Sequence, residues 1–374
     1  MALSWVVYAA FLPALAAQAG LPKSAVVWLL LLDQVVFMVS DLLAGVASDR
    51  MADSVARWGQ VLGLLTGVAA IALLAMPLLA GSIASPVLLI ALALVWVTCS
   101  SALRAPLFAL LGKRARSSTG SEFRWLLLGG GIAAAFAPYL QNALKGISPS
   151  LPFALVAASL VLCAVLIGRS AARSGEAGAA AARAVQPALP RATWFFVALA
   201  CAALALQMHN FFNSGRLFLR DVPAAQLHWW LPAFWAGFNL ALLMPPLLGA
   251  LPLARRLGLF GAVGAAALLS CAQAPAAGTQ AVLQAMAGAA WAVFLSTSFS
   301  TANALGSDRR QGRYAGGVHA VLAGGSVLRL AMASAALPVT MGDTLLWLPA
   351  ILWGAGAIVL LFASQLGDRQ VDAN

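Results

Sequence analysis

The chain has 374 residues, of which 62% are hydrophobic and only 9% are charged, and its formal net charge is +11. Soluble globular proteins have about 25% charged residues, so this composition excludes a water-soluble domain. The basic residues lie in short connections between apolar runs. Because membrane topology explains that placement, we do not expect nucleic acid binding in spite of the positive charge.

Long apolar runs recur along the sequence, and each is long enough to cross the ~30 Å hydrocarbon core of a bilayer as a helix. We therefore predict an all-α integral membrane protein with twelve transmembrane helices in two six-helix bundles. The first six predicted helices cover residues 2–20, 25–48, 60–81, 86–112, 122–143 and 150–168. The second six cover residues 193–214, 228–250, 257–273, 279–304, 314–337 and 343–365.

The connection at residues 169–192 is rich in Ala, Arg and Gly, and it lies halfway along the chain. It is predicted to be a flexible cytoplasmic linker between an N-terminal bundle, residues 1–168, and a C-terminal bundle, residues 193–374. Fifteen Lys and Arg residues fall on one set of alternate connections and four on the other. Because basic loops stay in the cytoplasm, both termini are expected there, with the bundle in the cell (inner) membrane.

Gly45-Val46-Ala47-Ser48-Asp49-Arg50 follows the second predicted helix and matches the pattern G-x-x-x-D-R. The loop at the equivalent place in the second half carries Arg255 and Arg256, and another basic loop precedes the eleventh predicted helix. With twelve spans and a central linker, the chain resembles the major facilitator superfamily over essentially its whole length. The resemblance implies alternating access, in which the two halves rock about a central site lined by helices one, four, seven and ten.

The resemblance also places the Asp49–Arg50 loop against the start of the eleventh helix. The N-terminus of a helix has unpaired N–H groups and the positive end of the helix dipole, so Asp49 is expected to hold the cytoplasmic face closed. The alternative is a solvated loop charge that only orients the chain. Arg50, the second charge of the motif, is predicted to take part in the same gate.

Charged residues inside the predicted spans are costly in hydrocarbon and therefore mark candidate functional sites. Asp41 and Arg104 lie at nearly equal depth in helices two and four, which predicts an ion pair within the N-terminal half. Asp33 and Arg329 lie at matching depth in helices two and eleven, which predicts a pair across the halves that forms when the outer side closes. The alternatives are permanent structural bridges, or charges that face different directions.

Polar and aromatic residues near the midplane are predicted to contact the substrate, because amide groups that face lipid lack hydrogen-bond partners. These residues are Gln34, Gln207, His209, Asn210, Trp235, Asn239 and Trp291. A packing role is the alternative for His209. The tryptophans suit a ligand with apolar surface, and Arg104 and Arg329 point to an anionic or amphipathic solute unless the two aspartates neutralise them.

These observations predict a secondary active transporter for a small organic solute, acting as a monomer with no cofactor and no metal. A P-loop for ATP is absent from the sequence, and a buried carboxyl group at Asp33 or Asp41 is suited to carrying protons. Uniport, and efflux of apolar compounds in place of uptake, stay open. A channel or a signalling receptor is the alternative from another class, and scattered histidines give no support to an intramembrane enzyme.

Overall fold

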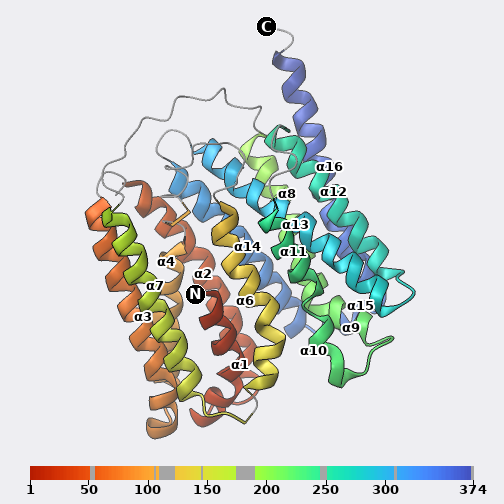
Figure 1. The fold of residues 1–374 in the computed structure, drawn as a ribbon. Helices are drawn as coiled ribbons and strands as arrows, with labels where there is room; N and C mark the ends of the chain where they lie inside the picture. Colours follow the sequence, from red (N-terminus) through yellow and green to blue (C-terminus); the bar gives the residue numbers. More distant parts are fainter. Residues whose placement is uncertain are drawn as a thin grey trace.

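The computed structural model describes residues 1–50, 55–104, 107–108, 123–144, 146–173, 190–244, 251–306 and 310–371. All regular secondary structure within these ranges is helical. The N-terminal half, residues 1–173, contains α1 (Ala2–Gln18), α2 (Ala25–Arg50), α3 (Val55–Ile83), α4 (Pro86–Ala102), α6 (Phe123–Ala143) and α7 (Ser150–Arg173). The two halves lie side by side in Figure 1, with the N-terminal helices on the left.

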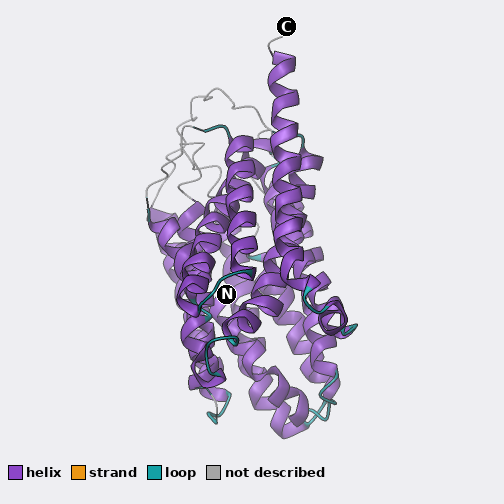
Figure 2. Ribbon diagram, turned by 90° about the vertical axis from the view of Figure 1, so that its right-hand side faces the viewer, coloured by secondary structure: helices purple, strands orange, loops and turns teal. Residues whose placement is uncertain are grey.

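The C-terminal half, residues 190–371, begins with a helix built from three segments, α8 (Ala192–Met208), the π-helix η1 (His209–Asn213) and α9 (Ser214–Phe218). After it come η2 (Ala224–Gln226), α10 (Leu227–Trp230), α11 (Ala233–Leu243), α12 (Leu253–Ala272), α13 (Ala277–Leu305), α14 (Gln311–Ser334), α15 (Leu337–Met341) and α16 (Thr344–Val371). Figure 2 shows that the long helices run lengthwise through the bundle and that α16 extends beyond it.

Eight of the described helices are long and apolar enough to cross a membrane, and α1, α4 and part of α7 are shorter apolar helices. The predicted all-α membrane architecture is therefore confirmed, whereas the count of twelve spans stays a prediction. Three predicted helices differ in detail from the structure. Helix α4 ends at Ala102, and the end predicted at residue 112 lies outside the described residues. The predicted helix 228–250 is divided into α10 and α11 at Pro232, and the seventh helix continues four residues past residue 214, to Phe218.

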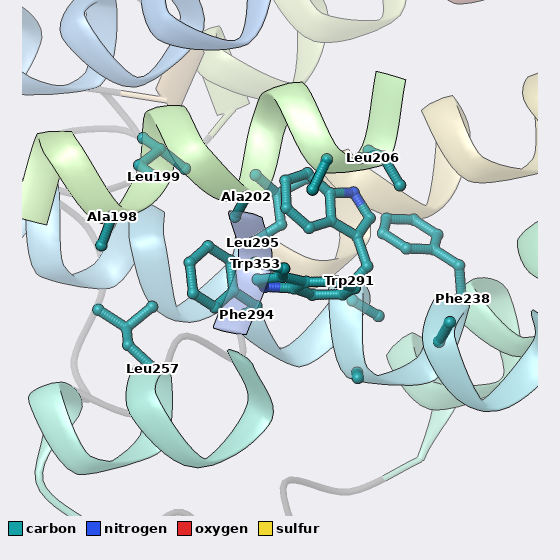
Figure 3. Close-up of a cluster of buried hydrophobic side chains, with 14 of the residues drawn as sticks. Ala198, Leu199, Ala202, Leu206, Phe238, Leu257, Trp291, Phe294, Leu295 and Trp353 are labelled. Atoms are coloured by element: carbon teal, nitrogen blue, oxygen red, sulfur yellow. The ribbon is translucent and has the colours of Figure 1, made fainter. Parts of the chain in front are cut away.

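The apolar core has two main parts, one centred in each half, and each part includes some side chains of the other half. In the N-terminal half the core includes the fully buried side chains of Tyr8, Trp96 and Phe153. In the C-terminal half Trp291, Phe294 and Trp353 pack together, and Figure 3 shows these rings among aliphatic side chains of neighbouring helices. The halves meet along two seams, where α2 packs against α14 and α6 packs against α11. The predicted linker at 169–192 falls largely on residues 174–189, which lie outside the described ranges.

Candidate functional site

Asp49, in the last turn of α2, joins the N-terminal half to the first turn of α14. Its Oδ1 accepts a hydrogen bond from the backbone N–H of Gly312 at 2.7 Å, and its Oδ2 accepts one from the N–H of Arg313 at 2.9 Å. The N–H groups of a first helical turn have no partner inside the helix, so the carboxylate satisfies two of them at the positive end of the helix dipole. The predicted contact is confirmed. We call this end of the bundle the Asp49 face and the opposite end the far face.

Glycines let α2 and α14 approach closely beside Asp49. A Cβ atom at Gly45 would collide with the backbone of Gly312, and a Cβ atom at Gly316 would collide with the backbone of α2. A further contact toward the far face is made by Met38, whose Sδ lies 3.7 Å from the Cβ position of Gly324. Larger side chains at the glycine positions would therefore force the two halves apart at the Asp49 face.

Four buried rings from both halves pack together on the Asp49 face. Phe108 and Phe123 belong to the N-terminal half, and Phe299 of α13 and His319 of α14 belong to the C-terminal half. The Phe108 ring centroid lies 4.0 Å from that of Phe299 and 4.8 Å from that of His319, and Phe123 lies 6.0 Å from Phe299. This four-ring cluster and the Asp49 hydrogen bonds join the two halves on that side.

The predicted ion pair between Asp41 and Arg104 is confirmed. A guanidinium nitrogen of Arg104 lies 2.7 Å from one carboxylate oxygen of Asp41, and the Ser101 hydroxyl donates to the other oxygen at 2.7 Å. Asp41 is fully buried, and the guanidinium carbon of Arg104 lies 4.3 Å from the centroid of the Phe37 ring. Because its charge is neutralised within the N-terminal half, Arg104 is a poor candidate for binding an anionic solute.

Asp33 is the second buried acid of α2, and its side chain turns toward α1. Its carboxylate accepts a hydrogen bond from the Tyr8 hydroxyl at 2.8 Å, and Tyr8 in turn packs against Trp96 of α4. Only 1% of Asp33 is exposed. Among the described residues, no Lys or Arg side chain lies within ion-pair distance of this carboxylate. Asp33 is therefore a buried acid whose partner is a neutral hydroxyl.

Arg329 of α14 turns toward the seventh helix and does not meet Asp33. Its guanidinium carbon lies 3.8 Å from the centroid of the Phe211 ring in η1. Its Nε is buried without a hydrogen-bond partner, and within the described ranges no acidic side chain pairs with it. A permanent Asp33–Arg329 bridge is therefore wrong for this conformation, since the two side chains point to different helices. A pair that forms only when the outer side closes stays a prediction.

Several of the predicted substrate-binding residues lie on the seventh helix where its α-helical hydrogen bonding is interrupted by η1. Such π-turns often occur at functional sites. His209 is buried, with its ring centroid 6.5 Å from that of Phe234, which favours the packing alternative. Gln207 and Asn210 are partly exposed, and Oε1 of Gln207 has no hydrogen-bond partner. Gln207 is thus more available to a ligand than His209 is.

The remaining predicted substrate contacts differ in their surroundings. Trp235 and Asn239 are partly exposed on α11, and Asn239 lies against Gly131 of α6 at the seam between the halves. The predicted contact of Trp291 with substrate is not supported by its surroundings. Trp291 is 2% exposed and packs inside the C-terminal core shown in Figure 3, so the structure favours a packing role over the predicted contact with substrate. Gln34 is nearly buried beside Asp33, and Arg50 is exposed at the end of α2.

Comparison with solved structures decides the fold. No protein-family model matches the sequence, and no curated protein matches it significantly. The E. coli fucose:proton symporter FucP, a major facilitator superfamily transporter, matches with a TM-score of 0.68 at 14% identity, over 97% of this chain and 96% of FucP. The chain has the major facilitator fold.

Two further structures with this fold match at similar levels. A bacterial homologue of the iron transporter ferroportin, in an outward-facing state, gives a TM-score of 0.67 at 15% identity, over 98% of this chain and all of that one. The human organic anion transporter MFSD10 gives 0.65 at 13% identity, over 98% of this chain and 96% of that one. At these identities the likeness establishes the major facilitator fold alone.

Three residues of the site were not predicted from the sequence. Tyr8 and Ser101 donate hydrogen bonds to Asp33 and Asp41, and the guanidinium of Arg329 stacks on the ring of Phe211. Each is an ordinary residue in an apolar helix, so only the packing of the major facilitator fold reveals its partner. The one available signal was for Ser101, which lies three residues before Arg104 and therefore on the same face of a helix.

Proposed function

We propose that this chain is a secondary active transporter, which moves a small organic solute across the cell membrane by alternating access. The observation that carries the proposal is the concentration of contacts between the halves at one end of a major facilitator fold. The Asp49 hydrogen bonds, the glycine contacts and the four-ring cluster all lie on the Asp49 face. Separation of the two halves there would break a compact set of contacts and leave most of each apolar core intact.

The contacts on the far face support the same proposal. There, the ring contacts between the described parts of the two halves are those of Tyr139 on α6 with His228 and Trp229 on α10, at 6.0 and 5.1 Å. The excess of basic residues on the Asp49 side supports a cytoplasmic location for that face and for both termini. On this orientation, the structure corresponds to a state that is closed toward the cytoplasm.

We further propose that protons drive transport through Asp33. A buried carboxyl group without a basic partner changes its charge each time it binds or releases a proton, whereas Asp41 is already paired with Arg104. In a low-dielectric interior, that change of charge alters the relative stability of the two conformations. This coupling explains why a charged residue is kept inside a span, where it is otherwise costly.

The test uses proteoliposomes that contain an internal pH-sensitive dye. Small organic solutes are added in turn, with and without an imposed pH gradient. The expected result is that at least one solute moves protons with the wild-type protein, at a rate that saturates with solute concentration. Asp33→Asn should abolish solute-driven proton movement, whereas Asp221→Asn, a change at an exposed acid on the far face, should not.

Two results would contradict the proposal. A solute flux that rises in proportion to concentration, without saturation and without exchange of labelled for unlabelled solute, would indicate a channel. Saturable flux that responds equally to a pH gradient in wild type and Asp33→Asn would leave a transporter but exclude Asp33 as the proton carrier.

A further inference from the structure

Arg329 lies within a membrane-spanning helix, and among the described residues no acidic side chain pairs with it and no side-chain hydrogen bond neutralises its charge. Arg104 pairs with Asp41, and Arg216 pairs with Asp343 at 2.6 Å. Arg220 donates to the backbone carbonyl of Ala272. Within the part of the chain that the structure describes, Arg329 contacts the stacked ring of Phe211, and its Nε is buried without a hydrogen bond. An unpaired charge within a membrane-spanning helix is costly, so a mobile anion is its natural counter-charge.

We propose that Arg329, Phe211 and Gln207 form a binding site for the anionic group of the transported solute, so that the cargo is an organic anion carrying a carboxylate or a phosphate. The identification of this anion as cargo rests on the proposed transport function. The site itself does not, because binding requires no movement of the halves.

Arg329 lies on a stripe of α14 residues that begins at the interface between the halves. His319, Leu322, Ser326 and Arg329 recur at spacings of three, four and three residues and therefore form one stripe along the helix. At the Asp49 end of the stripe, His319 packs against Phe108 of the other half. Nearer the far face, Ser326 and Arg329 are only partly buried. The stripe thus leads from the closed end of the bundle to an accessible end.

The orientation of the guanidinium suits it to an anion. Phe211 covers one face of the group, at 3.8 Å, and 61% of Phe211 is exposed, so the stacked pair does not lie inside the apolar core. A guanidinium that stacks through its face keeps its in-plane N–H donors free, and these donors match the two oxygens of a carboxylate or phosphate.

Gln207 supplies the second polar group of the site. It lies four residues before Phe211, which places it on the same face of the seventh helix one turn nearer the Asp49 face. Its side chain is partly exposed and its Oε1 has no hydrogen-bond partner. The Gln207 amide can therefore donate to the bound anion or accept from a neighbouring hydroxyl of the solute.

A lipid phosphate is the other possible source of the anion. Arg329 lies five residues before the end of α14, or about 7 Å along the helix axis, which is within reach of a lipid headgroup for a long side chain. The experiment must therefore separate a soluble anion from a phospholipid.

The binding test measures thermal unfolding by tryptophan fluorescence in dodecyl maltoside without added phospholipid, at constant ionic strength. The probes are benzoate, succinate and glycerol 3-phosphate, each compared with its uncharged counterpart, benzamide, succinamide or glycerol. The expected result is a saturable rise in melting temperature with at least one anion and none with its counterpart. Arg329→Gln should raise the half-saturating concentration at least tenfold, and Arg329→Lys should raise it less, because lysine keeps the charge without the planar fork.

Further variants keep the test decisive. Arg216→Gln removes an exposed arginine on the far face and should bind the anion as wild type does. If Arg329→Gln does not fold, Phe211→Leu takes its place. This variant keeps the charge of Arg329 but removes the ring stacked on it, and it should also raise the half-saturating concentration of the anion. The proposal is overturned if no anion stabilises the wild type, if the uncharged counterparts act equally, or if the Arg329 and Phe211 variants that fold respond as wild type does.

A parallel set of samples contains phosphatidylglycerol or phosphatidylcholine in mixed micelles. Stabilisation by phosphatidylglycerol that depends on Arg329, without any effect of the soluble anions, would assign Arg329 to lipid and overturn the proposal. Because these measurements need neither a gradient nor flux, a negative result here is distinct from a failure of the proton-flux experiment with Asp33→Asn.

Discussion

Replacement of Asp49 by asparagine tests whether a single side chain holds the Asp49 face closed. The wild-type carboxylate accepts two backbone hydrogen bonds, from Gly312 and Arg313, at the start of α14. Asparagine is nearly identical in shape, keeps one acceptor oxygen, and presents an NH₂ donor where the second acceptor was. The change therefore removes one hydrogen bond and the negative charge at the helix N-terminus, while the packing of α2 against α14 remains.

The size of the effect follows from these two losses. A hydrogen bond to a charged group contributes about 1.5–3 kcal/mol, and a charge at a helix end contributes about 0.3–1 kcal/mol. Because Asp49 is only partly buried and one hydrogen bond is retained, we expect a loss of about 2 kcal/mol from the closed state. Since every 1.4 kcal/mol is a factor of ten, the ratio of closed to open molecules should fall about 30-fold.

Spin labels on the Asp49 face measure this ratio directly. Gln60 on α3 and Thr193 on α8 are both exposed at that end, one in each half, and are replaced by cysteine after the four native cysteines are changed to serine. Electron–electron double resonance in lipid nanodiscs should show a longer distance population in Asp49→Asn than in the labelled parent. Asp221→Asn, at an exposed acid on the far face, is the matched control and should leave the distances unchanged.

An identical distance distribution in Asp49→Asn and the parent would refute the role of Asp49 in closure. Loss of folding in Asp49→Asn would count against the estimate as well, because the glycine contacts and the four-ring cluster do not depend on this carboxylate.

Three further predictions concern packing. Arg104→Ala should lower the stability of the protein by about 3–5 kcal/mol because it leaves Asp41 buried without its counter-charge. Adding Asp41→Asn to this variant should restore part of the loss. A wild-type melting temperature of Arg104→Ala would contradict this prediction. Gly316→Leu should hold the Asp49 face apart in the spin-label assay, whereas Gly129→Leu, where no atom lies within 4 Å of the Cβ position, should not. Trp291→Ala should destabilise the protein by about 3–5 kcal/mol, as expected for a core tryptophan. Trp291→Phe should keep transport and solute preference, and a changed preference would indicate that Trp291 contacts the substrate.

The amino-acid sequence by itself determined the all-helical membrane architecture and two of the contacts made by its charged residues. Apolar runs of spanning length are a local property, so most helices could be located before the structure was known. The G-x-x-x-D-R pattern, through the resemblance to the major facilitator superfamily, correctly placed Asp49 against α14, and equal depth along neighbouring helices correctly paired Asp41 with Arg104. Equal depth predicts such pairs because the rise per residue of a helix is constant and the spans are nearly parallel.

Only the tertiary structure decided which way each side chain faces. Equal depth also predicted a pair between Asp33 and Arg329, yet α2 directs Asp33 to Tyr8 and α14 directs Arg329 to Phe211. In an aqueous protein, polarity distinguishes the inner and outer faces of a helix, but helices in lipid are apolar on nearly every side. The position of a residue along its helix therefore gives its depth in the membrane but not the neighbouring helix that its side chain faces. That direction depends on how the helices and the two halves pack.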